Sequence, residues 1–419
     1  MTLSKKSGAI SAFIWNKTFD KNRKNMIKSI LDTDLYKFSV SYAYFNLYPL
    51  AEGTFTFTDR MREKWPEESR KKIAARFGDE LDILSGMSLT EQGMKWCKEN
   101  IPYIPGTYWE WLSSFRFDKS AVKYGFDDDG VFFCEVTDSL YKVTLYEIMV
   151  LAAYSEIRNE MLGVPLNEKA TERLICEKIA FANENNITFS EFGTRRRFSS
   201  RYQEIVMSCL ENYASTCAGT SNVYYAMRYG MKPTGTFPHE WVMFHGACFG
   251  YKRANYLSLE DWIKTYRGDL GTALVDTYTT DSFLHTLTRQ QALLLSGFRQ
   301  DSGDEFKVGD NIIRRLDELG VDPKTKTIVF SNGLDFRKAG KVNEYFAGRC
   351  RPAFGIGTNL TCDIPELNYK PANIVMKLSK CRMSPKDDWE RCIKLSDDDG
   401  KHMGDSQEIN CAKFELRLP

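Results

Sequence analysis

The feature that most constrains the fold is an alternation in the second half of the chain, where short apolar runs are separated by helical segments. Apolar strands that alternate with helices indicate a parallel sheet covered by helices. The number of these units, with acids, arginines and glycines at the trailing end of the strands, favours a TIM-like α/β barrel whose trailing edge carries the chemistry. The strand candidates are residues 187–193, 233–237, 272–278, 296–303, 327–333, 353–358 and 373–378.

The first half of the chain has a mixed pattern. GTFTFTDR (53–60) alternates as a half-buried strand does, and EESRKKIAARFG (67–78) has the composition of a helix. Two strand candidates, 122–126 and 131–136, flank the turn sequence DDDG, which predicts a hairpin. TLYEIMVLAAYSEIRNEML (144–162) predicts a long helix.

These patterns predict an irregular TIM-like α/β barrel with an N-terminal mixed α/β domain. We expect an N-terminal extension at residues 1–29, the mixed domain at residues 30–145 and the catalytic barrel at residues 146–379. The polar segment 380–419 is expected to pack back against the N-terminal domain.

Composition limits the classes of partner. The 57 basic and 56 acidic residues give a net charge of +1, which argues against binding nucleic acid through bulk charge but leaves room for local anion pockets. The eleven cysteines have no metal-ligand spacing, which indicates reduced thiols in the cytoplasm or, in a eukaryote, the nucleus. No apolar run approaches the ~20 residues that span a bilayer, and no secretory signal is evident. We expect no membrane partner.

Three consecutive arginines follow a predicted strand in EFGTRRR (191–197). A charge run is often a solvated face. The alternative is that Arg195 lies over a pocket, where its guanidinium group binds phosphate oxygens. Arg196 and Arg197 are then expected to face solvent in part.

His239, in GTFPHE (235–240), is one of only four histidines. A lone histidine is often a packed core residue. Here it follows a strand-end turn, precedes Glu240 and stands at the expected start of a helix, a setting that suits a nucleophilic or phosphate-accepting imidazole.

Two aspartates follow neighbouring strands, Asp276 in VDTYTTD and Asp301 in FRQDSGD. Carboxylates that share a cavity can bind Mg²⁺ or ribose hydroxyl groups. Arg299 precedes Asp301 by two residues, so their side chains share a strand face. The alternative for this pair is a plain salt bridge.

A glycine-rich strand end, FGIGTN (354–359), lets backbone N–H groups approach a phosphate, and Thr358 adds a hydroxyl donor. SNGLD (331–335), after the preceding strand, would complete the cradle. Two anion sites, two acids and a candidate nucleophile together fit a phosphorylated sugar as substrate.

An ordered set of motifs, from about Ile30 to about Asp405, resembles the nicotinate phosphoribosyltransferase family of fungal and bacterial type. The motifs are ILDTDLYKF, EFGTRRR, GTSN, GTFPHEW, DTYTTDSF, RQDSGD, FGIGTN, NIVMKLSK and KHMGD. The resemblance implies a type II phosphoribosyltransferase that joins nicotinate to 5-phosphoribosyl 1-diphosphate in NAD salvage, giving nicotinate mononucleotide and diphosphate. It also implies Mg²⁺, with no ligand assigned, and ATP hydrolysis coupled through a phosphohistidine at His239.

The resemblance assigns roles to the other candidates. Arg195 and Arg299 would lie near diphosphate and substrate, Asp301 would hold ribose hydroxyl groups, and Asp276 would assist near ribose and diphosphate. The residues expected to cradle the 5′-phosphate are Gly333, Gly357 and Thr358.

Tyr36 and Phe192 match the aromatic positions that sandwich the pyridine ring. Nicotinamide-using relatives carry GTD where this chain has Ser221, so the absence of a carboxylate at that position favours nicotinate. Phe237-Pro238 departs from the family, in which alanine commonly precedes the histidine, and this departure concerns the geometry of the loop. Relatives also suggest a homodimer in which the segment around Tyr36 completes the site of a neighbouring chain.

Two alternatives stay open at this point. The same fold can use nicotinamide, or quinolinate with a more basic pocket for two carboxylates. A catalytically silent barrel that binds a nucleotide or a partner is the alternative from another class, and it has no need of His239 beside intact RQDSGD and FGIGT motifs.

Overall fold

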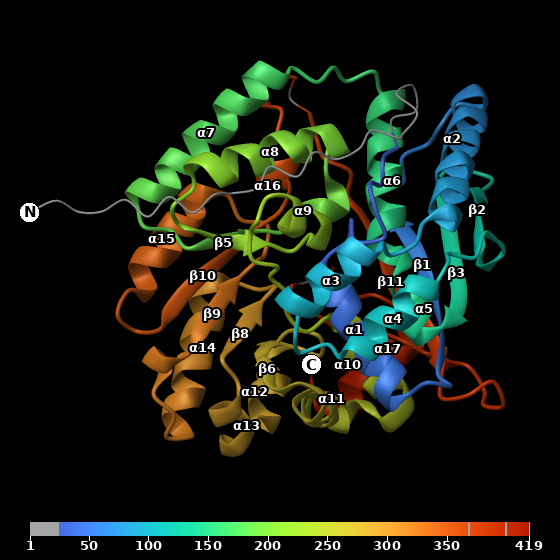
Figure 1. Ribbon diagram of the computed structural model, residues 1–419. Coiled ribbons are helices and arrows are strands. Elements are labelled where there is room, and N and C mark those ends of the chain that lie inside the picture. The colour runs from blue at the N-terminus through green and yellow to red at the C-terminus, as the bar shows by residue number, and fades with distance from the viewer. Residues whose placement is uncertain (1–24, 368, 399, 419) are drawn as a thin grey trace, which may run out of the picture.

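The computed structural model describes residues 25–418 apart from residues 368 and 399. Figure 1 shows two sheets, with the antiparallel sheet on the right and the parallel sheet on the left of the view. Met26 and Ile27, which belong to the predicted N-terminal extension, are buried in the core. Most of the extension lies outside the described residues. Within the described part of the chain, no helix combines the length and the apolar character that a bilayer crossing requires.

The antiparallel sheet has the order β12-β11-β1-β3-β2. Both the strand predicted at residues 53–60 and the hairpin are confirmed. The segment 373–378, which was expected beside the parallel strands, forms β11 and pairs antiparallel with β1 instead. An apolar run records burial but not the sheet in which the strand is buried. The strands are β1 (Glu52–Asp59), β2 (Val122–Phe126), β3 (Phe132–Ser139), β11 (Ile374–Arg382) and β12 (Glu390–Arg391).

The second sheet is parallel throughout, with the order β5-β4-β10-β9-β8-β7. The segment 233–237 contributes only a single bridge, from Pro233 to Thr220, rather than a full strand. The pairs among the described residues leave β5 and β7 at the two edges, so closure into a barrel stays a prediction. The strands are β4 (Phe189–Glu191), β5 (Cys217–Thr220), β7 (Thr272–Leu274), β8 (Gly297–Gln300), β9 (Thr327–Phe330) and β10 (Arg351–Ile356), and β6 (Arg267–Leu270) leads into β7.

Two hydrophobic cores follow from these sheets. One joins the antiparallel sheet to α1, α6, α10 and α11, and the other lies between the parallel sheet and α7, α8, α14 and α15. The helices are α1 (Leu35–Leu47), α2 (Glu67–Gly86), α3 (Glu91–Asn100), α4 (Gly106–Ser114), α5 (Leu140–Val143), α6 (Tyr146–Met161), α7 (Glu168–Glu184), α8 (Ser200–Tyr213), α9 (Val223–Arg228), α10 (His239–Phe249), α11 (Tyr251–Tyr266), α12 (Thr280–Thr286), α13 (Arg289–Leu294), α14 (Glu305–Glu318), α15 (Phe336–Phe346), α16 (Thr358–Thr361) and α17 (Ser406–Leu416).

Some polar residues after the parallel strands serve the fold rather than the site. Asp304 and Asp335 cap α14 and α15, because their carboxylates accept hydrogen bonds from the N–H groups of Lys307 and Lys338. These caps fix the start of α14 shortly after β8 and the start of α15 shortly after β9. The remaining strand-end side chains are then free to face a cavity.

Candidate active site

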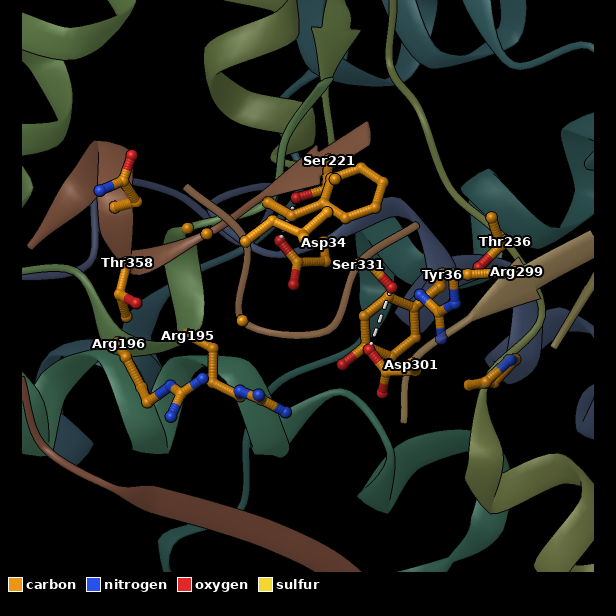
Figure 2. A pocket seen from close by; sticks show the side chains of 18 of the residues that line it. Asp34, Tyr36, Arg195, Arg196, Ser221, Thr236, Arg299, Asp301, Ser331 and Thr358 are labelled. Atoms are coloured by element: carbon orange, nitrogen blue, oxygen red, sulfur yellow. Dashed lines mark hydrogen bonds between the residues drawn. The ribbon is translucent and has the colours of Figure 1, made fainter. Parts of the chain in front are cut away.

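A cavity of about 420 Å³ opens at the carboxyl edge of the parallel sheet. It receives residues that follow β4, β5, β8, β9 and β10, as expected for parallel strands whose ends meet at one edge. Asp34 and Tyr36 at the start of α1, Glu147 of α6 and Lys377 of β11 also line it, as do residues of the segment 235–240 that leads into α10. The antiparallel half of the molecule therefore supplies part of the site, and Figure 2 shows the side chains that converge there.

All the predicted site residues line this cavity except Asp276, which is fully buried. The residues that the structure brings together are Tyr36, Phe192, Arg195, Ser221, His239, Arg299, Asp301, Gly333, Gly357 and Thr358. Gly333 has φ 58°, which favours glycine. A Cβ on the neighbouring Gly355 would lie 2.5 Å from the Phe192 ring, so the close approach of that ring needs glycine as well.

Arginine side chains line the cavity in two separate regions, which we call the two cationic places. Figure 2 shows Arg195 and Arg196 on the side of Thr358, apart from Arg299 and Asp301. Among the described residues, no carboxylate lies within 4.0 Å of a nitrogen of the three guanidinium groups, and Arg299 Nε is buried without a hydrogen-bond partner. Burial, then the charges of Arg195 and Arg60, lower the pKa of Arg196 to about 10. These arginines have no carboxylate partner of their own in the described part of the chain and are available to a ligand. Because they lie in two separate regions, they suit a ligand that has a negative group at each end.

The third arginine of the run differs from the expectation that it partly faces solvent. Arg197 is completely buried and binds both carboxylate oxygens of Asp32, at 2.9 and 3.0 Å. It also donates to the Met26 carbonyl oxygen, 2.7 Å away. Arg197 thus ties the start of the described chain to the loop that carries Arg195.

His239 is the first residue of α10, and both of its ring nitrogens have partners. Nδ1 lies 2.9 Å from Thr277 Oγ1. Nε2 lies 3.1 Å from Asp301 Oδ2 and 3.1 Å from Lys394 Nζ. Burial, together with the positive charge of Lys394, lowers the pKa of His239 to about 4, so the imidazole is neutral near pH 7.

The two aspartates lie close to His239. One ligand atom each from His239, Asp276 and Asp301 fall within 4.8 Å of one another. Burial opposes the ionisation of Asp301, but the hydrogen bond to His239 and the charge of Arg299 outweigh it and hold its pKa well below the usual value. Asp276 accepts a hydrogen bond of 2.5 Å from Ser302 through Oδ2, while its Oδ1 is buried without a partner.

The carboxyl group of Asp34 lies beside Ser221. Ser221 Oγ donates to Asp34 Oδ1 over 2.8 Å, so a carboxyl group does line this wall although none stands at position 221. Burial raises the pKa of Asp34, against the effect of the Ser221 hydrogen bond and the charge of Arg195. Tyr36 and Phe192 line the same cavity, and their sandwich of a pyridine ring stays a prediction.

Two models of a known protein family match this chain. The N-terminal domain of the nicotinate phosphoribosyltransferase family matches residues 31–155, and the family's main model matches residues 187–419. The chain belongs to the nicotinate phosphoribosyltransferase family. A nicotinate phosphoribosyltransferase of Desulforapulum autotrophicum is 38% identical over 391 residues, which cover 93% of this chain and 98% of the relative.

Solved structures of this family superimpose along most of the chain. The nicotinate phosphoribosyltransferase of Porphyromonas gingivalis has a TM-score of 0.90 and 44% identity, covering 94% of this chain and 100% of that one. The protein of that name from Vibrio cholerae has a TM-score of 0.87 and 31% identity, covering 94% of each chain. The mixed α/β fold with its parallel sheet is therefore that of the family.

The Mg²⁺ that the family implies fits the acids of this site. The orphaned Oδ1 of Asp276 is a buried oxygen that can hold a cation, and Asp301 supplies a second carboxylate. The imidazole of His239 is not a preferred Mg²⁺ ligand and is engaged by its other neighbours.

Several site residues were missed at the sequence level. Asp34 and Lys377 lie in motifs quoted for the resemblance, and Ser331 lies in the SNGLD segment, so a closer inspection of each polar residue could have found them. Ser331 Oγ donates to Asp301 Oδ1 over 3.0 Å, as Figure 2 shows. Lys394 had no such signal, since it is one of many charged residues in a polar tail.

A buried ion network under the cavity was also missed. The Lys37 ammonium group binds Glu147 and Glu240, and Lys377 Nζ lies 4.0 Å from Glu147. Burial lowers the pKa of Lys377 to about 8. Because Glu240 directly follows His239, the network fixes the start of α10 against α1 and α6.

Proposed function

We propose that this protein catalyses nicotinate phosphoribosyl transfer. The pyridine nitrogen of nicotinate attacks C1 of 5-phosphoribosyl 1-diphosphate, the C1–O bond to diphosphate breaks, and diphosphate leaves with the bonding electrons. The observation that carries this proposal is the pair of separated cationic places in one cavity, which suits a pentose with phosphate groups at both ends.

The protein groups have distinct tasks in this scheme. Thr358 and Gly357 hold the 5′-phosphate, Arg299 neutralises charge that develops on the leaving diphosphate, and Asp301 binds ribose hydroxyl groups. Mg²⁺ held by Asp276 and Asp301 would supply further charge neutralisation. The assignment of Arg195 to the diphosphate stays a prediction, since it lies on the same side of the view as Thr358 in Figure 2 and therefore also suits the 5′-phosphate.

We propose further that ATP hydrolysis is coupled to this reaction, as part of NAD salvage. The lone pair of one His239 ring nitrogen attacks the γ-phosphorus of ATP, the bond to the bridging oxygen breaks, and ADP leaves with the electron pair. A neutral, buried imidazole at a helix start supports this role. A homodimer and a cytoplasmic location remain part of the proposal.

The position of Asp34 supports nicotinamide as a second candidate substrate. A carboxylate at this wall can accept a hydrogen bond from the amide NH₂ group of nicotinamide, whereas it repels the carboxylate of nicotinate. The names of the relatives and the positive charge of Arg195 favour nicotinate. Turnover on nicotinate, nicotinamide and quinolinate, measured side by side, separates the three substrates.

The deciding assay is the formation of nicotinate mononucleotide with and without ATP. Wild-type protein should form the product and gain from ATP, and His239→Ala should lose that gain. A variant that keeps the full coupling of ATP to product would refute the phosphohistidine. Absence of any product from all three bases would favour the silent binding protein.

A further inference from the structure

Lys394 reaches the active site from the far end of the chain. Its N–H donates to the Met403 carbonyl oxygen over 3.0 Å, and Met403 N–H donates back over 2.9 Å. The next residue, Leu395, donates from its N–H to the Thr277 carbonyl oxygen over 2.9 Å. These bonds fix the segment against the strand end that carries Asp276 and bring the buried Lys394 side chain up to His239.

The two neighbours of His239 Nε2 require opposite hydrogen-bonding roles from this nitrogen. A lysine ammonium group only donates, so Lys394 requires a lone pair on Nε2. An ionised carboxylate only accepts, so Asp301 requires a proton there. Both lie 3.1 Å from the same nitrogen, and a neutral ring can satisfy only one of them at a time.

The other ring nitrogen is compatible with either state. Thr277 Oγ1, 2.9 Å from Nδ1, can donate to it or accept from it, because a hydroxyl group does both. Neither neighbour loses its last partner when the other prevails. Asp301 keeps the hydrogen bond from Ser331, and Lys394 Nζ keeps its ion pair with Asp276 Oδ2 at 3.6 Å.

Of the groups that contact the two ring nitrogens, only Asp301, beside Nε2, lines the cavity. Nδ1 and its partner Thr277 are buried, and Thr277 does not line the cavity. Nε2 points toward Asp301, which does. A nucleophile needs its lone pair on the side of the incoming phosphorus, so Nε2 must be the nitrogen without a proton.

We propose that Lys394 is a positioning residue that competes with Asp301 for Nε2 and so keeps His239 in the tautomer with a reactive Nε2 lone pair. This inference rests on the proposed phosphohistidine. In the transfer, the hydrogen bond from Lys394 to Nε2 breaks, and the freed Nε2 lone pair forms the bond to phosphorus. ADP leaves with the electrons of the broken P–O bond, and the Nδ1 proton stays on the ring beside Thr277. The ammonium group of Lys394 then lies against the transferred phosphoryl group and neutralises its charge.

The direct test is spectroscopic and needs no activity. Protein labelled with ¹⁵N in histidine carries only four such side chains, and long-range ¹H–¹⁵N correlation distinguishes the two neutral tautomers. The His239 signals are identified by their loss in His239→Gln. Lys394→Met should shift His239 toward the Nε2–H tautomer, and Asp301→Ala should shift it the opposite way.

The matched control is Lys401→Met. Lys401 lies on the same polar segment and pairs with Asp398, while its Nζ donates to Asn332 Oδ1 over 3.1 Å. This change should leave the His239 signals in place. Lys394→Gln repeats the test if the methionine variant folds poorly, and an unchanged tautomer in a folded Lys394 variant overturns the inference.

A chemical readout completes the design. With labelled ATP, wild-type protein should carry an acid-labile phosphate on Nε2, and Lys394→Met should form it about 100-fold more slowly, on the order of losing one pre-organised donor. Lys394→Arg should recover most of the rate. Phosphate on Nδ1 would overturn the inference. A tautomer shift in a protein that never becomes phosphorylated would refute the ATP coupling while supporting the positioning by Lys394.

Discussion

Replacing Arg299 by alanine separates a substrate-binding arginine from a structural one. Arg299 Nε is buried without a hydrogen-bond partner, and its charge is one of the effects that lower the pKa of Asp301. A guanidinium group about 4 Å from a diphosphate charge, at an effective dielectric constant of about 20, contributes roughly 4 kcal/mol. Losing that interaction in the transition state corresponds to a fall in kcat/KM of about 1,000-fold.

The effect on folding should be far smaller. Arg299 forms no ion pair within 4.0 Å among the described residues, so the free energy of unfolding should change by about 1 kcal/mol or less. The assay is kcat/KM for phosphoribosyl diphosphate from product formation, with urea unfolding of the same preparations. Arg351→Ala is the matched control, since Arg351 is exposed at the opposite end of the sheet. A large loss of stability with a parallel loss of activity would show a plain salt bridge and refute the argument.

Three further changes test other parts of the account. Thr358→Val should raise KM for phosphoribosyl diphosphate about tenfold, the loss of one hydrogen bond to a charged group, and leave ATP hydrolysis largely intact. An unchanged KM removes Thr358 from the phosphate site. Asp32→Ala should lower the free energy of unfolding by about 3–5 kcal/mol, because it leaves the buried Arg197 charge without its partner, and a loss under 1 kcal/mol in urea unfolding would contradict this. Burial raises the pKa of Glu191 to about 7 against the hydrogen bonds of Thr220, Gly193 and Gln203. The folded state therefore holds a proton that the unfolded chain releases above pH 4.5, and the stability from this group is present below that pH and lost as pH rises toward 7. Glu191→Gln should remove that part of the pH dependence, and an unchanged slope of unfolding free energy between pH 4.5 and 7 would show that the carboxyl group is ionised.

The sequence predicts which strand-end residues share the cavity, because parallel strands place their carboxyl ends along one edge. Arg299, Asp301 and Thr358 could be brought together by that rule alone. Tyr36 and Ser221 were joined to them only through the resemblance, since no local pattern says which strand end the start of α1 approaches. The contact between Asp34 and Ser221, 187 positions apart, shows how non-local that placement is.

The parts that sequence analysis missed are those set by long-range packing. Arg197 and Arg196 belong to one charge run, yet the first is buried against Asp32 and the second lines the cavity, because the short helical turn Thr194–Arg196 points successive side chains in different directions. The strand 373–378 was recognised as buried but placed in the wrong sheet. Lys394 meets His239 across 155 residues, and its neighbours along the chain give no indication of that contact.

The central claim is that one cavity at the carboxyl edge of the parallel sheet holds phosphoribosyl diphosphate. A crystal structure of the protein with this compound and Mg²⁺ tests it most directly. The account predicts the 5′-phosphate against Gly357 and Thr358, and the diphosphate on the side of Arg299 and Asp301. Density for the ligand on another face of the molecule, or a reversed orientation within the cavity, would contradict it.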